Sequence, residues 1–312
     1  MQPKVREPFF AIRAFNVEVA SIKDGRHRSS TDDESSQLHV EKSSMAMHLR
    51  MEWWKSAISN MYNDTFSSTT SKDPSMSELM SHVISSQKQN PVVRSLHRAI
   101  SEFNLTRRFL ERLIESRDND LDITQFQNIH ELVQYSEDSV ASLLYLNLEC
   151  CNVRSPDADM IASNVGTGIG FITAIRSIIP RIALSAEVAI PRDLCEKYSI
   201  TPKYLQDIFQ NYDIDAATKS KEDENLQGAV KELCHIAHLH LSLARGQQHL
   251  VPMEGRLCLL PAVTALHYIS ALEKLDYNIL HPDLLTNDGL QGRIYLLKNM
   301  LKLLRTKYTG VF

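Results

Sequence analysis

The sequence has little glycine, no long apolar run and no excess of positive charge. Ten glycines and eleven prolines in 312 residues favour a mostly helical protein over a turn-rich β-sandwich. The 34 basic and 38 acidic residues leave a net charge of −4, which gives no reason to expect a nucleic-acid partner. No stretch approaches the roughly 18 to 20 apolar residues of a membrane-spanning helix, so we expect at most a peripheral membrane contact.

The N-terminal residues carry no recognisable address. Residues 1–8 have neither the apolar core of a signal peptide nor the Arg- and Ser-rich pattern of a transit peptide. The compartment in which the protein works must therefore be inferred from other features.

Cysteine is scarce and is not spaced for a disulfide framework or a zinc site. The five residues are odd in number and form no C-x-x-C pair: Cys150, Cys151, Cys195, Cys234 and Cys258. We expect them to be buried small apolar side chains in a reducing compartment.

Apolar residues at helical spacing dominate what is present. Hydrophobic residues make up 43% of the chain, which excludes disorder of the chain as a whole. Stripes at steps of three and four predict helices at 9–23, 45–62, 129–148, 226–245, 262–274 and 292–307, with a further one or two from Val92 that break at Asn104. Polar composition predicts flexible loops at about 25–44 and 63–75. The sequence therefore predicts an all-α fold, with 1–312 as one helical domain.

Two short motifs have a chemical and a structural interpretation. Gly166, Gly168 and Gly170 match neither phosphate-binding glycine pattern, so we interpret them as points where two helices approach closely. His235, His238 and His240 lie in one helical segment, but H-E-x-x-H is absent and no third ligand is evident, so we expect ordinary packed or half-exposed histidines and no metal site.

A basic amphipathic stretch lies near the C-terminus. Between 293 and 307 it carries five cations and no acid: Arg293, Lys298, Lys302, Arg305 and Lys307. Such a helix can lie on an anionic membrane or dock a partner, or it can simply pack its apolar face and leave its basic side in water.

Several segments together resemble the motifs of one known family. They are 10–16 (FAIRAFN), 131–136 (ELVQYS), 172–176 (ITAIR), 189–191 (AIP), and the closing stretches 237–245 and 260–262. In this order they resemble the squalene and phytoene synthase family of head-to-head prenyl transferases. The resemblance implies a helical bundle of the isoprenoid synthase type.

The resemblance also implies where the chemistry of the family would be. Its members hold an allylic diphosphate through Mg²⁺, which is bound by two D-x-x-x-D motifs because Mg²⁺ prefers carboxylate oxygens. The first motif falls on Ala20 and Asp24, and the second on Ser177 and Arg181. An arginine of the family is replaced by Glu187.

The motif positions therefore imply a protein without the family's metal cluster. Only Asp24 and Arg176 match functional positions of the family, and with Tyr135 they are the residual pocket candidates. We expect no catalytic residues, no metal and no cofactor, and hence a pseudoenzyme.

Three further segments are similar to one branch of the family, the mitochondrial complex I assembly factors. They are 13–19, 50–54 and 142–146. The branch implies a protein on the matrix side of the inner membrane whose partners are complex I subunits or assembly intermediates. Arg293, Lys298, Lys302 and Arg305 are the candidates for a peripheral contact with that membrane.

Two alternatives remain open at this stage. One is a divergent prenyl transferase that uses Mg²⁺ and recruits Asp193, Asp207, Asp213 or Asp215 as ligands. The other is a protein that keeps the family's cavity as an isoprenoid or lipid pocket without chemistry.

Overall fold

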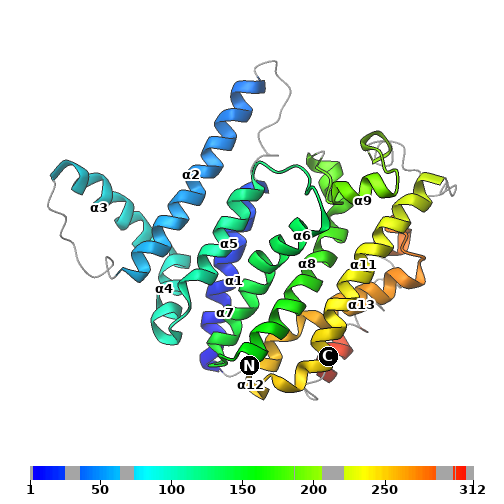
Figure 1. Cartoon of the computed structure of the whole chain (residues 1–312). Coiled ribbons are helices and arrows are strands. Elements are labelled where there is room, and N and C mark those ends of the chain that lie inside the picture. Colours follow the sequence, from blue (N-terminus) through cyan, green and yellow to red (C-terminus); the bar gives the residue numbers. More distant parts are fainter. Residues whose placement is uncertain are drawn as a thin grey trace. The chain divides into compact units, whose positions relative to one another are not determined.

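The computed structural model describes residues 3–24, 36–63, 74–185, 187–205, 221–285, 298 and 300–306. Within these residues every regular element is a helix and none is a strand, which confirms the predicted all-α fold (Figure 1). Close packing divides the chain into two compact units, 1–122 with 145–154 and 123–144 with 155–312. The expectation of a single domain over 1–312 stays a prediction.

The first unit is built from five helices and the second half of a sixth. The five are α1 (Pro3–Asp24), α2 (Ser36–Tyr62), α3 (Pro74–Gln89), α4 (Pro91–Phe103) and α5 (Arg107–Asp120), and the sixth is α7 (Ser142–Cys150). The sequence defines the boundary between α4 and α5. Asn90 caps the start of α4 by accepting from the Val92 and Val93 amides at 2.8 and 3.2 Å, and Asn104 ends it in the left-handed conformation with φ 51°.

The apolar stripes of the sequence form the core of this unit. Phe15 of α1 meets Trp54 of α2 edge to face, with ring centroids 5.2 Å apart. The predicted α2 stripe is fully buried: Met47, Met51, Trp54 and Ile58. Leu96, Leu110 and Ile114 of α4 and α5 are buried as well, so both helices pack as their spacing predicts.

The second unit contains the long central helices. Its elements are α6 (Ile129–Ser136), the π-helical turn η2 (Glu137–Ala141), the start of α7, α8 (Pro156–Ser185), α9 (Arg192–Lys197), α11 (Lys221–Gln247), η3 (Gln248–Leu250), α12 (Met253–Arg256), η4 (Leu257–Leu259), α13 (Pro261–Lys274) and α14 (Pro282–Leu285). Residues 298 and 300–306 are also helical.

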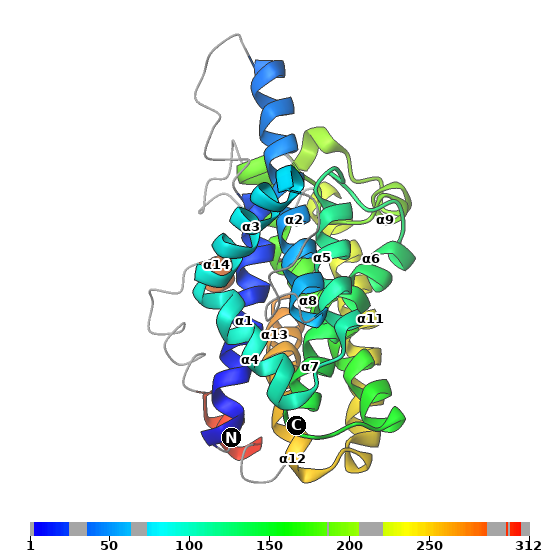
Figure 2. The same ribbon diagram turned by 90° about the vertical axis from the view of Figure 1, so that its left-hand side faces the viewer.

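Helices α8 and α11 lie side by side in both views (Figure 1, Figure 2). Three glycines of α8 allow neighbouring helices to approach. A Cβ on Gly166 would lie 2.5 Å from Ala141 Cα, one on Gly168 would lie 2.6 Å from Leu241 Cγ of α11, and one on Gly170 would collide with the Ser136 hydroxyl of α6. The interpretation of these glycines as points of close helix packing is confirmed.

One predicted boundary was wrong. The loop predicted at about 25–44 ends earlier, because α2 begins at Ser36, whereas α3 begins at Pro74, close to the end of the loop predicted at about 63–75. Residues 36–44 are polar, but Gln, Leu, Glu and Lys are good helix formers, and they extend an amphipathic helix that is already present. The remainders of both loops, 25–35 and 64–73, lie outside the described residues.

The expectation that no stretch is apolar enough to span a membrane was also wrong. Within the described residues, Pro156–Ala183 and Met253–Lys274 are long and apolar enough by length and composition. Buried core helices pass the same test, and more than half of the Pro156–Ala183 window is buried in the protein. The apolar character of α8 is explained by its position between α6 and α11.

The cysteines are apolar packing residues, as expected. All but Cys151 are buried, and these five described cysteines form no disulfide. Burial raises the pKa of the Cys150 and Cys234 thiols to about 12 and that of Cys195 to about 11. Thiolate chemistry at these three positions is therefore suppressed at neutral pH.

Candidate functional site

The C-terminal third of α8 carries the positions that the resemblance assigns to the second metal motif. Ser177 is half-buried, and its hydroxyl donates to the Ala174 carbonyl at 2.8 Å. Arg181 follows one turn later on the same side of the helix, after Pro180. The Ser177 hydroxyl thus donates to a carbonyl of its own helix, and the second position of the motif carries the guanidinium of Arg181.

Arg181 forms an ion pair with Glu187. The distance from Arg181 Nη1 to Glu187 Oε2 is 3.4 Å, and the side chains are 28% and 5% exposed. A buried carboxylate requires a compensating charge or hydrogen bonds, and the guanidinium supplies positive charge. Arg181 and Glu187 therefore tie the end of α8 to the extended segment that follows it.

The segment after Glu187 is fixed by backbone hydrogen bonds to residues 124–127. The Val188 amide donates to the Thr124 carbonyl at 3.1 Å, and the Arg192 amide donates to the Phe126 carbonyl at 2.9 Å. Gln125 Nε2 donates to the Ile190 carbonyl at 2.9 Å. These hydrogen bonds between the two segments hold Glu187 in place opposite the end of α8.

Asp193 and Glu131 cap α6. Asp193 Oδ2 accepts from the Ile129 amide at 3.1 Å, while Asn128 Oδ1 accepts from the Glu131 amide at 2.9 Å. Glu131 Oε2 in turn accepts from the Gln127 amide at 2.8 Å. The carboxylates of the ELVQYS segment and of Asp193 thus satisfy backbone donors at a helix start. Asp207, Asp213 and Asp215, the other ligands considered for a divergent transferase, lie outside the described residues.

Two further site candidates pack against aromatic rings. Tyr135 of α6 lies against Phe126 with ring centroids 5.4 Å apart. Arg176 of α8 is exposed, and its guanidinium carbon lies 5.8 Å from the centroid of Tyr268 of α13. The structure therefore places Tyr135, Arg176, Ser177 and Arg181 within the second unit on packed helices.

The first motif lies in the first unit. Ala20 is exposed on α1, and Asp24 is the last residue of that helix, with its side chain outside the described residues. Phe10 and Val17, on the same side of α1 as Ala20, are 57% and 62% exposed. Arg6 and Arg13 share this side of α1, which therefore mixes apolar residues with cations.

The residues at the motif positions do not fit a Mg²⁺ cluster. Ala20 offers no ligand atom, the Ser177 hydroxyl is engaged by its own helix, and Arg181 places a cation where a ligand is needed. In the described parts of the chain, no three His, Cys, Asp or Glu side chains are grouped so that they could hold a metal ion. His235 and His238 are exposed, and His240 Nδ1 lies 2.9 Å from Asn164 Oδ1, as expected for ordinary histidines.

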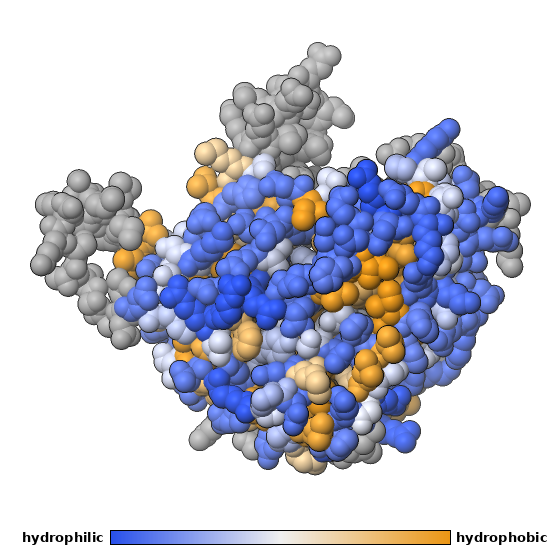
Figure 3. All heavy atoms as spheres, viewed as in Figure 1, coloured by the Kyte–Doolittle hydropathy of each residue, from blue (hydrophilic) through white to orange (hydrophobic). Residues whose placement is uncertain are grey.

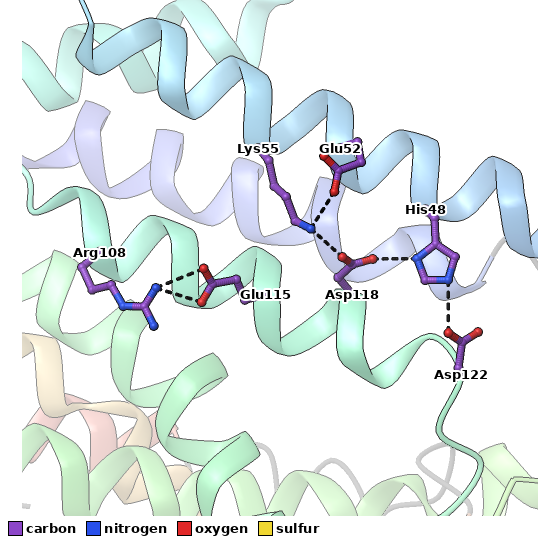
Figure 4. A network of polar contacts seen from close by, with 7 residues as sticks. All are labelled: His48, Glu52, Lys55, Arg108, Glu115, Asp118 and Asp122. Atoms are coloured by element: carbon purple, nitrogen blue, oxygen red, sulfur yellow. Dashed lines mark hydrogen bonds and ion pairs between the residues drawn. The ribbon is translucent and has the colours of Figure 1, made fainter.

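A second polar cluster joins α2 to α5 in the first unit (Figure 4). His48 Nδ1 lies 2.8 Å from Asp118 Oδ1, and its Nε2 lies 3.2 Å from Asp122 Oδ2. Lys55 Nζ donates to Asp118 Oδ2 at 2.6 Å and to Glu52 Oε1 at 2.7 Å. The hydrogen bond with Asp118 raises the pKa of His48, whereas burial of Asp118 is outweighed by the Lys55 and His48 hydrogen bonds, which lower its pKa.

The sequence interpretation missed two polar features. The Glu149 carboxylate is buried and is bound by the Thr106 amide at 2.8 Å, the Thr106 hydroxyl and Arg154. The π-helical turn η2 interrupts the helix between Ser136 and Ser142, and Glu137 accepts from the Ser163 hydroxyl at 2.6 Å. Neither feature could be recognised from residue spacing. The Glu149 contacts join segments that are distant in the sequence, and the π-helical turn does not interrupt the stripe of apolar residues.

An all-helical body with these motif segments in this order defines the class of protein. The chain belongs to the squalene/phytoene synthase family, because the model of that family matches residues 1–298. The family expected from the sequence is thereby confirmed.

The curated relatives share one name within this family. NADH dehydrogenase (ubiquinone) complex I, assembly factor 6, of Mus musculus is 30% identical over 274 residues, which cover 88% of this chain and 68% of the relative. The Homo sapiens protein of the same name is 28% identical, and the match covers 89% of this chain and 69% of that protein. A Drosophila melanogaster homologue of it is 26% identical and covers 96% and 76%.

Solved structures agree on the fold. A dehydrosqualene synthase in complex with ligand superposes with a TM-score of 0.66 at 13% identity, covering 99% of this chain and 89% of that one. Squalene synthase HpnC from Alicyclobacillus acidocaldarius gives 0.53 at 16% identity, covering 89% and 97%. The fold is therefore that of the isoprenoid synthases.

Proposed function

We propose that the protein assists the assembly of mitochondrial respiratory complex I, the NADH:ubiquinone oxidoreductase, and does so without prenyl-transfer chemistry. The observation that carries the second half of this proposal is the Arg181–Glu187 ion pair, at a position where the family's chemistry needs a metal ligand. The first half is supported by the relatives, which are named as complex I assembly factors.

The electrostatics of the second motif support a pseudoenzyme. Mg²⁺ must neutralise the diphosphate that leaves the allylic carbon, and its ligands are hard anionic oxygens. Arg181 is only partly exposed, so its repulsion of a divalent cation nearby would be weakly screened. Neither Ala20 nor Ser177 supplies negative charge to offset it.

An assay with the family's substrates tests the absence of chemistry. Purified protein incubated with Mg²⁺ and farnesyl or geranylgeranyl diphosphate should release no diphosphate and give no hydrocarbon product. A dehydrosqualene synthase run in parallel shows that the assay works. A hydrocarbon product that disappears when Asp24 is replaced would instead establish a divergent prenyl transferase.

Partners in this proposal are complex I subunits or assembly intermediates. Figure 3 shows hydrophobic residues gathered along α11 on a face that is otherwise largely hydrophilic. Leu239 and Leu243 of α11, one turn apart, are 53% and 49% exposed. An exposed apolar stripe of this kind gives a newly made hydrophobic subunit a place to bind.

We place the protein at the matrix side of the inner membrane, in peripheral contact with it. Fractionation tests this placement: the chain should be released from inner membranes by carbonate and be protected from protease in intact mitoplasts. Digestion in mitoplasts would contradict it. A lipid retained in the family's substrate cavity stays a prediction, which native mass spectrometry of gently isolated protein tests.

A further inference from the structure

The helical segment 298 and 300–306 exposes most of its side chains, although Leu303 is half-buried and Thr306 is buried. Its apolar side chains Met300, Leu301 and Leu304 are 52%, 55% and 42% exposed, and its cations Lys298, Lys302 and Arg305 are exposed as well. The interpretation of this stretch as a terminal helix with a packed apolar face is therefore wrong for these three residues. Arg293 and Lys307, the outer cations of the stretch, lie outside the described residues.

Charge and apolar surface are segregated around this helix. Lys298, Lys302 and Arg305 follow one another at steps of four and three, so they share one side. Met300 and Leu304, themselves one turn apart, fall on the opposite side, because a step of 100° per residue places them roughly half a turn from the cations. Leu301 lies at the border between the two sides, three residues from Lys298 and four from Arg305. An exposed helix with one apolar and one cationic side has the pattern of helices that lie in the plane of a membrane interface.

We propose that this segment, which we term the C-terminal interfacial helix, binds the surface of an anionic phospholipid bilayer. Its apolar side chains enter the boundary between headgroups and acyl chains, and its cations contact lipid phosphates. Charge complementarity favours lipid over protein as the occupant: the sequence from 293 to 307 contains five cations and no acid, whereas protein surfaces usually present both signs.

The inference rests on the proposed function only for which membrane is meant. It deepens that function by naming the residues that touch the membrane and the lipid class that they recognise. Binding to vesicles requires no complex I component, so the helix and the assembly role can fail separately.

The experiment is co-sedimentation of the full chain with phosphatidylcholine vesicles made with and without cardiolipin. The wild-type chain should bind the cardiolipin vesicles, and added salt should weaken the binding because surface charges are screened. Reversing three cations should weaken binding at low salt by about a hundredfold or more, since each contributes roughly a factor of five to ten. The variant carries Lys298→Glu, Lys302→Glu and Arg305→Glu.

A matched control carries the same change in net charge on other exposed positions. Arg94, Lys203 and Lys274 are exposed and lie on α4, after α9 and on α13. Their replacement by glutamate should leave vesicle binding within about threefold of wild type, because only long-range charge changes. Equal losses in both triple variants would show a general charge effect and overturn the assignment of the helix.

A second variant tests the apolar side. Replacing Met300, Leu301 and Leu304 by glutamine keeps every cation and should leave only a weak association that salt abolishes. Circular dichroism and thermal unfolding confirm that each variant is folded. Binding that is unchanged by the charge reversal, or equal binding to vesicles without cardiolipin, would overturn the proposal. Retention of the reversed variant by a complex I subunit while wild type ignores vesicles would do the same and would identify a protein occupant.

Discussion

Arg181 and Glu187 each carry the charge opposite to the one that the family resemblance assigns to their position, and the two side chains form an ion pair. The pair provides attraction between the end of α8 and the segment after it. The buried Glu187 carboxylate would be costly without positive charge nearby.

This pair predicts strong coupling between two substitutions. Arg181→Asp alone should lower the free energy of unfolding by about 1–3 kcal/mol, because it sets a second carboxylate beside buried Glu187; the partial exposure of Arg181 keeps the loss below that of a fully buried pair. Adding Glu187→Arg should recover much of the loss. Denaturant titration of the two single variants and the double variant gives the coupling, and additive effects would show that the pair does not act as a unit.

His48 predicts a pH-dependent contribution to stability. Its pKa is raised in the folded protein, chiefly by the hydrogen bond with Asp118 and further by Asp122. A group with a raised folded pKa stabilises the fold fully below its unfolded pKa, about 6.5, and the contribution is lost as pH rises through the folded pKa. Protonated His48 therefore holds α2 to α5 best in mild acid.

The measurement compares wild type with His48→Gln, which does not titrate. The difference in free energy of unfolding should be larger at pH 6 than at pH 9. Lys55, which also contacts Asp118, has a raised pKa and stays charged over this window, so it does not produce the change. A difference that grows toward pH 9 would contradict the role assigned to His48.

At the scale of a single helix, the glycines of α8 determine how closely its neighbours pack in the second unit. Gly166 of α8 lies against the Ala141 backbone, which cannot move aside as the end of a flexible side chain can. Gly166→Ala should lower the free energy of unfolding by about 1–3 kcal/mol through overpacking, despite the better helix propensity of alanine.

Gly246 of α11 provides the matched control. Nothing lies within 4 Å of the position that its Cβ would take, so Gly246→Ala should be neutral or stabilising by a few tenths of a kcal/mol. Thermal unfolding of the two variants side by side separates packing from propensity. Equal effects would mean that the contact with Ala141 has no energetic role.

At the same scale, the sequence predicts helices wherever an apolar stripe must be buried. Leu226, Val230, Leu233 and Leu241 of α11 are all buried, as their spacing requires. The start of α2 at Ser36 could not be predicted this way, because residues 36–44 lack a clear stripe and only their intrinsic propensity favours a helix. The sequence analysis also misjudged which segments are apolar enough to span a membrane, because buried core helices are as apolar as membrane-spanning ones.

For the molecule as a whole, the family resemblance proposes site residues but says nothing of their contacts. It assigns Ser177 and Arg181 to the second motif, whereas the pairing of Arg181 with Glu187 depends on the backbone hydrogen bonds between 188–193 and 124–127. The cap function of Asp193 likewise depends on the fold that brings it to Ile129. Long-range pairings of this kind follow from tertiary structure and leave no periodic signal in the sequence.

The central claim is that the whole protein serves complex I assembly without using the family's chemistry. Asp24 is the one carboxylate that remains at the four motif positions, so a surviving reaction would depend on it. The most direct measurement is the amount of assembled complex I, resolved on native gels, in cells that lack the chain and are complemented with wild type or with Asp24→Ala. We predict that loss of the chain lowers assembled complex I and that both versions restore it equally. Failure of a stably expressed Asp24→Ala chain to restore complex I, or normal complex I without the chain, would contradict the claim.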